Sequence, residues 1–89
     1  PEGIRVNAVA LGSIDTDRYR SLLSSQGPRA AARIEAQMAR LHPLGRVGGT
    51  AEVADAVAYL LSERASFISG VVLPVDGGRA AQGPDPEAS

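Results

Sequence analysis

Cysteine, tryptophan and lysine are all missing from this chain of 89 residues, and aromatic residues make up only 3% of it. The lack of cysteine excludes a disulfide framework, a thiolate metal site and a cysteine nucleophile. All nine basic side chains are arginine. Schiff-base chemistry, a Walker A phosphate site and a tyrosine–lysine pair are therefore excluded within these residues, because each requires a lysine amine.

Charge of one sign and long apolar runs are also scarce. The formal net charge is −1, so the chain has no basic surface of the kind that binds nucleic acid. No apolar run approaches the roughly 18 residues of a transmembrane helix, and no signal-peptide pattern occurs. We therefore expect a cytoplasmic protein without nucleic-acid or membrane partners. The chain begins at Pro1 rather than at a methionine, from which we expect a fragment or a processed product.

Two segments are predicted to be strands. Residues 4–11 carry apolar side chains on both faces, which favours a strand covered on both sides, as in a parallel α/β sheet. Val71–Val75 is a continuous apolar run between Gly70 and Asp76, and it indicates a second buried strand. Pro74 cannot donate a ladder hydrogen bond, so this strand is expected at a sheet edge.

Three helices are predicted between these strands, over residues 15–25, 29–41 and 50–62. Pro28 suits the first turn of the second helix. Thr50 is expected to cap the third, with Glu52 in its first turn. The third helix is apolar around most of its circumference and therefore needs two partners. The order is thus β-α-α-α-β with two parallel strands, and the chain needs more sheet than it contains.

Six short blocks follow one another along the chain, and their order and spacing are more specific than any single block. They are Gly3–Val9, Gly12–Thr16, His42–Arg46, Glu52–Ala54, Phe67–Gly70 and Val75–Gly78. Together they resemble the C-terminal part of the short-chain dehydrogenase/reductase family. The similarity is greatest to its bacterial 3-oxoacyl-carrier-protein reductases and glucose dehydrogenases.

This resemblance implies an α/β fold, the C-terminal portion of a doubly wound Rossmann sheet. Residues 1–79 would supply its last two parallel strands, with the N-terminal strands absent from this chain. Residues 13–41 would form a helical substrate lid, 50–62 a long interface helix and 71–75 the last strand. Residues 80–89 are expected to be a flexible tail.

The resemblance also implies a cofactor, NAD or NADP in the complete enzyme. The residues expected to contact it are Leu11, Gly12, Ile14 and Thr16, since ligands of open α/β sheets bind at the carboxyl ends of strands. The alternative for Thr16 is a helix cap. Leu11 stands where the family usually has proline, and this departure loosens the loop. The lid residues Tyr19, Leu22 and Leu23 would line a substrate pocket, with ordinary packing as the alternative.

The remaining polar residues are given structural roles. His42, the only histidine, is interpreted as a loop residue, and Arg46 with Glu52 as a loop-to-helix ion pair. Asp76-Gly77-Gly78 is interpreted as a strand-ending turn, because a lone aspartate makes a poor cation site. We expect no metal site. No catalytic residue is assigned, since neither tyrosine is followed by a lysine and no glycine-rich cofactor turn is present.

Two functions remain open. The chain is either the C-terminal piece of an NAD(P)-dependent oxidoreductase that interconverts a ketone and a secondary alcohol, or a truncated, non-catalytic remnant that serves only in assembly. The expected partners are the missing N-terminal part of the same fold and further copies of the chain. The copies would form a dimer or tetramer through Thr50–Ser62 and Val71–Val75.

Overall fold

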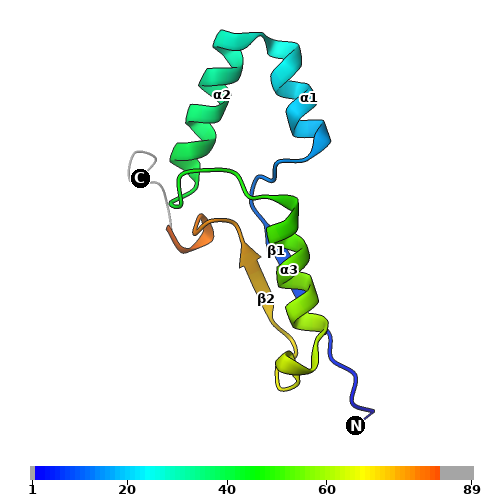
Figure 1. The fold of residues 1–89 in the computed structure, drawn as a ribbon. Coiled ribbons are helices and arrows are strands. Elements are labelled where there is room, and N and C mark those ends of the chain that lie inside the picture. Colours follow the sequence, from blue (N-terminus) through cyan, green and yellow to red (C-terminus); the bar gives the residue numbers. More distant parts are fainter. Residues whose placement is uncertain (1, 83–89) are drawn as a thin grey trace.

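The computed structural model describes residues 2–82 (Figure 1). Within them, seven elements follow one another: β1 (Ala8–Leu11), α1 (Asp17–Gln26), α2 (Pro28–Leu41), α3 (Thr50–Leu61), the 3-10 helix η1 (Glu63–Ala65), β2 (Val72–Val75) and the 3-10 helix η2 (Ala80–Gln82). The predicted order of strands and long helices is confirmed. In Figure 1 the α1–α2 hairpin extends beyond the end of the strands, whereas α3 lies beside them.

The two strands pair in parallel, as the sequence predicts. Ala8 lies opposite Val72 and Leu11 opposite Val75, so the carboxyl ends of both strands meet at one side of the sheet. This is the side from which the α1–α2 hairpin extends (Figure 1). The segments that follow Leu11 and Val75 are therefore brought together, although more than 60 positions separate them in sequence.

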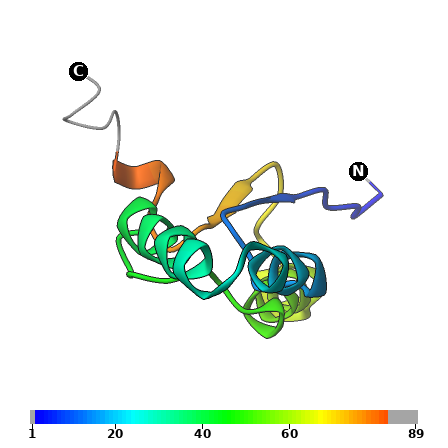
Figure 2. The ribbon, with the colours of Figure 1, turned by 90° about the horizontal axis from the view of Figure 1, so that it is seen from above.

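Helix α3 packs along one face of this sheet (Figure 2). Within residues 2–82 the buried apolar residues are Leu60 of α3 and Ala65 of η1, which are 7% and 0% exposed. Val6 and Val72, by contrast, are 70% and 63% exposed. Among the described residues, a single helix thus covers the strands, which carry apolar side chains on both faces. Much of their apolar surface therefore remains exposed.

The first strand is shorter than predicted, because a side chain replaces part of the ladder. The Asn7 amide group donates to the Ile68 carbonyl at 3.2 Å and accepts from the Val71 N–H at 3.0 Å. Further back, the Gly70 N–H donates to the Val6 carbonyl at 2.8 Å. Residues 4–7 therefore run beside the turn before β2 without forming a regular strand.

Arg5 ties the chain's N-terminal segment to the end of α3. Its guanidinium group donates to the carbonyls of Leu60, Ser62 and Ile68 at 2.9, 3.3 and 3.1 Å. The last carbonyls of a helix have no partner within the helix. A cation there also interacts favourably with the helix dipole. Arg5 thus completes the hydrogen bonding at the carboxyl end of α3.

Helix α3 begins one residue away from the predicted cap. Gly49, not Thr50, is the N-cap, and Thr50 is the first helical residue. The reason is Glu52, whose carboxylate accepts the Gly49 N–H at 2.8 Å while the Glu52 N–H donates to the Gly49 carbonyl at 3.0 Å. This reciprocal bonding satisfies the helix start without a hydroxyl group.

Helices α1 and α2 form a hairpin that packs mainly on itself, and neither contains a buried residue. Gly27 joins them at a φ of +81°, a conformation that glycine adopts without strain. Pro28 opens α2, as predicted. The hairpin is therefore joined to the rest of the described chain at its two ends, residues 12–16 and His42.

Two further expectations concern segments of the chain. No helix within residues 2–82 is long and apolar enough to cross a membrane. Of the predicted tail, Ala80–Gln82 form η2, and the rest lies outside the described residues.

Candidate functional site

The carboxyl ends of β1 and β2 meet at Gly12. Its N–H donates to the Val75 carbonyl at 3.0 Å, which extends the ladder by one bond. A Cβ atom at this position would lie 2.9 Å from the Cα of Asp76 and 3.0 Å from Nε2 of His42. Because such distances are shorter than real Cβ contacts, only glycine fits here without a shift of its neighbours.

The segment after Gly12 is held by the loop before α3. Ser13 accepts the Gly48 N–H at 2.9 Å, and the Asp15 N–H donates to the Gly48 carbonyl at 2.8 Å. Ile14 therefore forms an isolated parallel bridge with Gly48. Residues 13–15 are therefore fixed by backbone hydrogen bonds to this loop.

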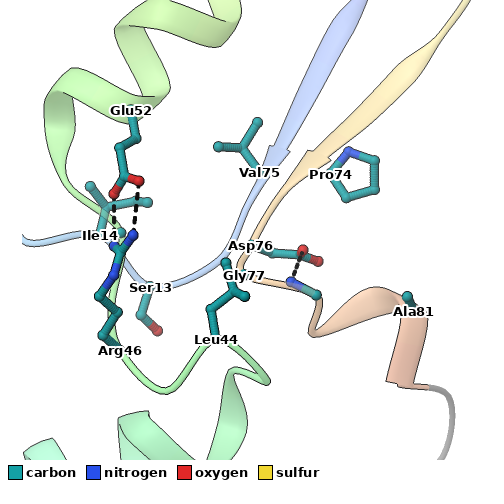
Figure 3. A pocket seen from close by; sticks show the side chains of 12 residues that line it. Ser13, Ile14, Leu44, Arg46, Glu52, Pro74, Val75, Asp76, Gly77 and Ala81 are labelled. Atoms are coloured by element: carbon teal, nitrogen blue, oxygen red, sulfur yellow. Dashed lines mark hydrogen bonds and ion pairs between the residues drawn. The ribbon is translucent and has the colours of Figure 1, made fainter.

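A cavity of about 430 Å³ lies between the segment after Gly12, the loop before α3 and the end of β2 (Figure 3). Its volume falls in the range of small-molecule sites, about 300–1,000 Å³. The lining comes from the residues after β1, the loop before α3 and the end of β2: Ser13, Ile14, Leu44, Arg46, Gly48, Glu52, Pro74, Val75, Asp76, Gly77, Gly78 and Ala81. Of the predicted cofactor-binding residues, Ile14 lines this cavity.

Two polar groups of the segment Gly12–Thr16 are available to a ligand. Among the hydrogen bonds of residues 2–82, none uses the N–H of Ile14. The Thr16 Oγ1 atom accepts the Tyr19 N–H at 3.1 Å and thereby caps α1. A hydroxyl group has one donor and two acceptor sites, so this cap leaves the Thr16 proton free to donate. The cap confirms the alternative reading of Thr16 without excluding a ligand contact.

Arg46 and Glu52 form the predicted ion pair on the wall of the cavity (Figure 3). Two hydrogen bonds of 2.8 and 3.0 Å join them. These bonds, together with the Gly49 N–H and the charge of Arg46, lower the pKa of Glu52 to about 2. Both side chains are about half exposed, so solvent weakens the attraction.

A second ion pair stands at the start of α1. Arg20 donates to both carboxylate oxygens of Asp15 at 2.9 Å. These hydrogen bonds lower the pKa of Asp15 from its ordinary value, and the charge of Arg20 acts in the same direction. Nearby, desolvation and then the charges of Glu35 and Asp15 raise the pKa of Tyr19.

His42 lies in the loop after α2, as predicted, but it is buried, which the sequence did not predict. Its side chain is 1% exposed and is the largest fully buried side chain of the described residues. The Ser13 N–H donates to Nε2 at 3.2 Å, and Nδ1 lies 2.7 Å from the Met38 carbonyl. The sequence holds one signal for this role: His42 follows the last turn of a helix, four residues after Met38.

Asp76 ends β2 as a turn, as predicted. Its carboxylate accepts the N–H groups of Gly78 and Ala80 at 3.0 and 2.8 Å (Figure 3 draws the first). Gly77 and Gly78 have φ values of +61° and +92°, which favour glycine. No group of three or more histidine, aspartate or glutamate side chains in residues 2–82 is placed to hold a metal ion.

The other predicted site residues lie apart from the cavity. Leu11 is exposed at the end of β1. Tyr19 and Leu23 are half-buried on α1, whereas Leu22 is 47% exposed. None of these four lines the 430 Å³ cavity, and neither do Gly12 and Thr16.

The chain is similar to dehydrogenases and reductases in both sequence and structure. A family model described as Enoyl-(Acyl carrier protein) reductase matches residues 1–80. The 3-oxoacyl-(acyl-carrier-protein) reductase FabG of Salmonella typhimurium is 49% identical over 76 residues, which are 85% of this chain and 28% of that protein.

Among the solved structures that match with a TM-score of 0.77 are the following two chains. One is the ligand-free aldohexose dehydrogenase of Thermoplasma acidophilum, 38% identical, with 91% of this chain and 33% of that chain covered. The other is ElxO with NADP bound, 35% identical, with 90% and 30% covered.

The match extends over nearly all of this chain but over a minor part of its relatives. The chain spans 28–34% of the length of three curated relatives that it matches. The two parallel strands and three helices correspond to the C-terminal part of a Rossmann-like fold. The chain therefore belongs to the short-chain dehydrogenase/reductase family, of which it represents the C-terminal portion.

Proposed function

We propose that this chain is part of an NAD(P)-dependent oxidoreductase that interconverts a ketone and a secondary alcohol by hydride transfer. The chain supplies the segment beside the nicotinamide, the substrate lid and an assembly interface. The observation that carries the proposal is the segment Gly12–Thr16. It is fixed at the carboxyl end of two parallel strands, where ligands of open α/β sheets bind, and Ile14 lines a cavity of about 430 Å³ there.

The donors of this segment fit the nicotinamide end of such a cofactor. A carboxamide needs a donor for its oxygen and an acceptor for its N–H₂ group. The Ile14 N–H is unused within residues 2–82 and can donate to the carboxamide oxygen. Two positions later, the Thr16 Oγ1 atom accepts one bond, from the Tyr19 N–H, and keeps a second acceptor site for the N–H₂ group. Gly12 lets the backbone of the two strand ends approach closely. The bound cofactor would supply or accept the hydride.

The role of this chain in catalysis is positioning. It contains no lysine, and neither tyrosine has a lysine four positions later, so the proton transfer that accompanies hydride transfer belongs to other residues of the enzyme. Holding a cofactor in one orientation contributes to rate by itself. The α1–α2 hairpin, which carries Tyr19, Leu22 and Leu23, would cover the substrate.

Exposed apolar surface supports two partners. The open sheet face, where Val72 is exposed, would be covered by helices of the N-terminal part of the same Rossmann fold. The outer side of α3 carries Tyr59 and Leu61, which are 45% and 78% exposed, and it would contact a second copy of the chain together with β2. A cytoplasmic location belongs to the same proposal.

Thr16 provides the direct test, in the complete protein. Thr16→Ala removes one hydrogen bond to the cofactor. The free energy of binding NADPH or NADH should therefore weaken by about 0.5–1.5 kcal/mol, with a matching rise in the dissociation constant. Thr16→Ser keeps the hydroxyl and should bind like the wild type. Isothermal titration with both cofactors measures the constants, and thermal unfolding without cofactor measures the separate loss of the cap, about 1 kcal/mol.

Three outcomes divide the hypotheses. A loss of affinity in Thr16→Ala that Thr16→Ser restores supports the contact. A loss of stability without a change in affinity leaves Thr16 as a cap only. A wild-type protein that binds neither cofactor and moves no hydride favours the non-catalytic remnant.

A further inference from the structure

His42 joins three parts of the molecule at one buried point. It is the C-cap residue of α2, its ring contacts the segment after β1, and its Cβ lies 3.4 Å from where a Cβ of Gly77, after β2, would stand. Its side chain is 1% exposed. The function proposed above leaves this buried polar group without a task.

The hydrogen bonds of the ring fix its tautomer. A backbone N–H can only donate, so Nε2, which takes the Ser13 N–H, carries no proton. Nδ1 therefore carries the proton and donates it to the Met38 carbonyl at 2.7 Å. The His42 backbone N–H also donates to this carbonyl, at 3.2 Å. The ring thus connects the last turn of α2 to Ser13 through one donor and one acceptor.

Ser13 lies between Gly12 and Ile14 in the candidate cofactor segment, Gly12–Thr16. Gly12 before it is packed against Asp76 and His42, and Ile14 after it lines the cavity. The Ser13 carbonyl is held by Gly48, whereas the Ser13 N–H is held by His42. Loss of the His42 bond would release one side of the peptide group that precedes Ser13, and the segment would sample more conformations.

We propose that His42 is a positioning residue, which holds the Gly12–Thr16 segment in the conformation that binds the nicotinamide cofactor. The inference rests on the proposed function for its ligand. A segment that spends only part of its time in the binding conformation binds more weakly by that fraction. The Nδ1 bond to Met38 is the brace that orients the ring, and the Nε2 bond to Ser13 is the one that acts on the site.

Two substitutions separate these bonds. In His42→Asn the amide nitrogen takes the place of Nδ1 and can donate to Met38, but nothing reaches Ser13. In His42→Gln the longer side chain places its carbonyl oxygen near Nε2 and can accept the Ser13 N–H, but the bond to Met38 is lost. Each variant keeps one hydrogen bond, so the two form a matched pair.

The test measures NADPH and NADH binding and amide hydrogen exchange of residues 12–16 in the complete protein. We expect His42→Asn to bind the cofactor roughly 2- to 10-fold more weakly, as for one lost hydrogen bond, and to exchange faster in this segment. His42→Gln should stay close to the wild type in both measurements, although both variants unfold at lower temperature. Rescue by glutamine would not follow from a packing role.

Equal losses of affinity in the two variants, or a larger loss in His42→Gln, would overturn the proposal. If the wild type binds neither cofactor, the proposed function fails, and with it the cofactor part of this inference. Exchange then decides the structural part, and equal rates in the two variants would reject it. If His42→Asn does not fold, the wild type decides: a Ser13 amide that exchanges as fast as exposed residues would overturn the role.

Discussion

The two halves of the described chain are held together in different ways. In the block formed by β1, β2, α3 and η1, residues far apart in sequence are joined by backbone pairing and by the side chains of Arg5 and Asn7. The buried residues Leu60 and Ala65 lie in this block. The α1–α2 hairpin has no buried residue, and its helices pack mainly on each other. Its stability is therefore local, whereas that of the block comes from tertiary contacts.

The candidate site lies where the two halves meet. Gly12 and Ser13 are anchored to the block through Val75 and Gly48, while Thr16 and His42 attach the same segment to the hairpin. A fixed segment beside a weakly anchored pair of helices is an arrangement suited to a rigid cofactor site with a lid that moves. The predictions below test this division, from the largest effect to the smallest.

The largest effect is expected from a charge on the outer side of α3. Ala58→Arg places a cation in the proposed contact with a second copy, so the complete protein should shift towards monomer, seen as a fall in mass by light scattering. The matched control, Ala36→Arg, puts the same side chain on the exposed face of α2 and should leave the mass unchanged. An unchanged mass in Ala58→Arg, with the fold intact, would remove α3 from the interface.

The next effect concerns Gly12, at the junction itself. Gly12→Ala forces a methyl group to within about 3 Å of Asp76 and His42, and such overpacking costs about 1–3 kcal/mol. The midpoint of urea unfolding should fall accordingly. Gly49→Ser is the control, because Gly49 is extended and its Cβ would meet only the Glu52 carboxylate at 3.5 Å. Equal stability of the two variants would contradict the close packing at Gly12.

Sequence patterns predicted the elements of the block because their signals are local. The apolar run Val71–Val75 and the composition of residues 4–11 are enough to predict two strands, and their parallel pairing follows from the helices between them. The Arg46–Glu52 pair could be predicted for the same reason, because the loop and the start of α3 are close in sequence.

Properties that depend on tertiary contact were beyond this reasoning. The burial of His42 follows from Ser13, 29 positions away, and no periodicity shows it. The strand start moved to Ala8 because Asn7 bonds across to Val71, 64 positions away. The cavity likewise needs the ends of both strands and the loop before α3. The residue types at the site could be predicted from the sequence, but their proximity in the fold could not.

The smallest expected effect is the pH dependence of the stability that the Arg46–Glu52 pair contributes. This pair lies on the wall of the cavity. The pKa of Glu52 is lowered in the folded chain from 4.5 to about 2. A lowered pKa in the folded state stabilises the fold above the unfolded value, so this contribution is present above about pH 4.5 and is lost as the pH falls towards 2. The melting temperatures of the wild type and Glu52→Gln should therefore differ near neutral pH and converge across this window.

The same pair predicts a dependence on salt. Its side chains are 56% and 51% exposed, so added salt should reduce the difference between wild type and Glu52→Gln already at neutral pH. Arg46→Gln combined with Glu52→Gln completes a double-mutant cycle, which isolates the pair from the Gly49 bond that Glu52 also makes. A coupling energy near zero at every pH and salt concentration would mean that Glu52 acts through the helix start alone. In that case the wall of the cavity is set by the capping of α3 and not by the ion pair.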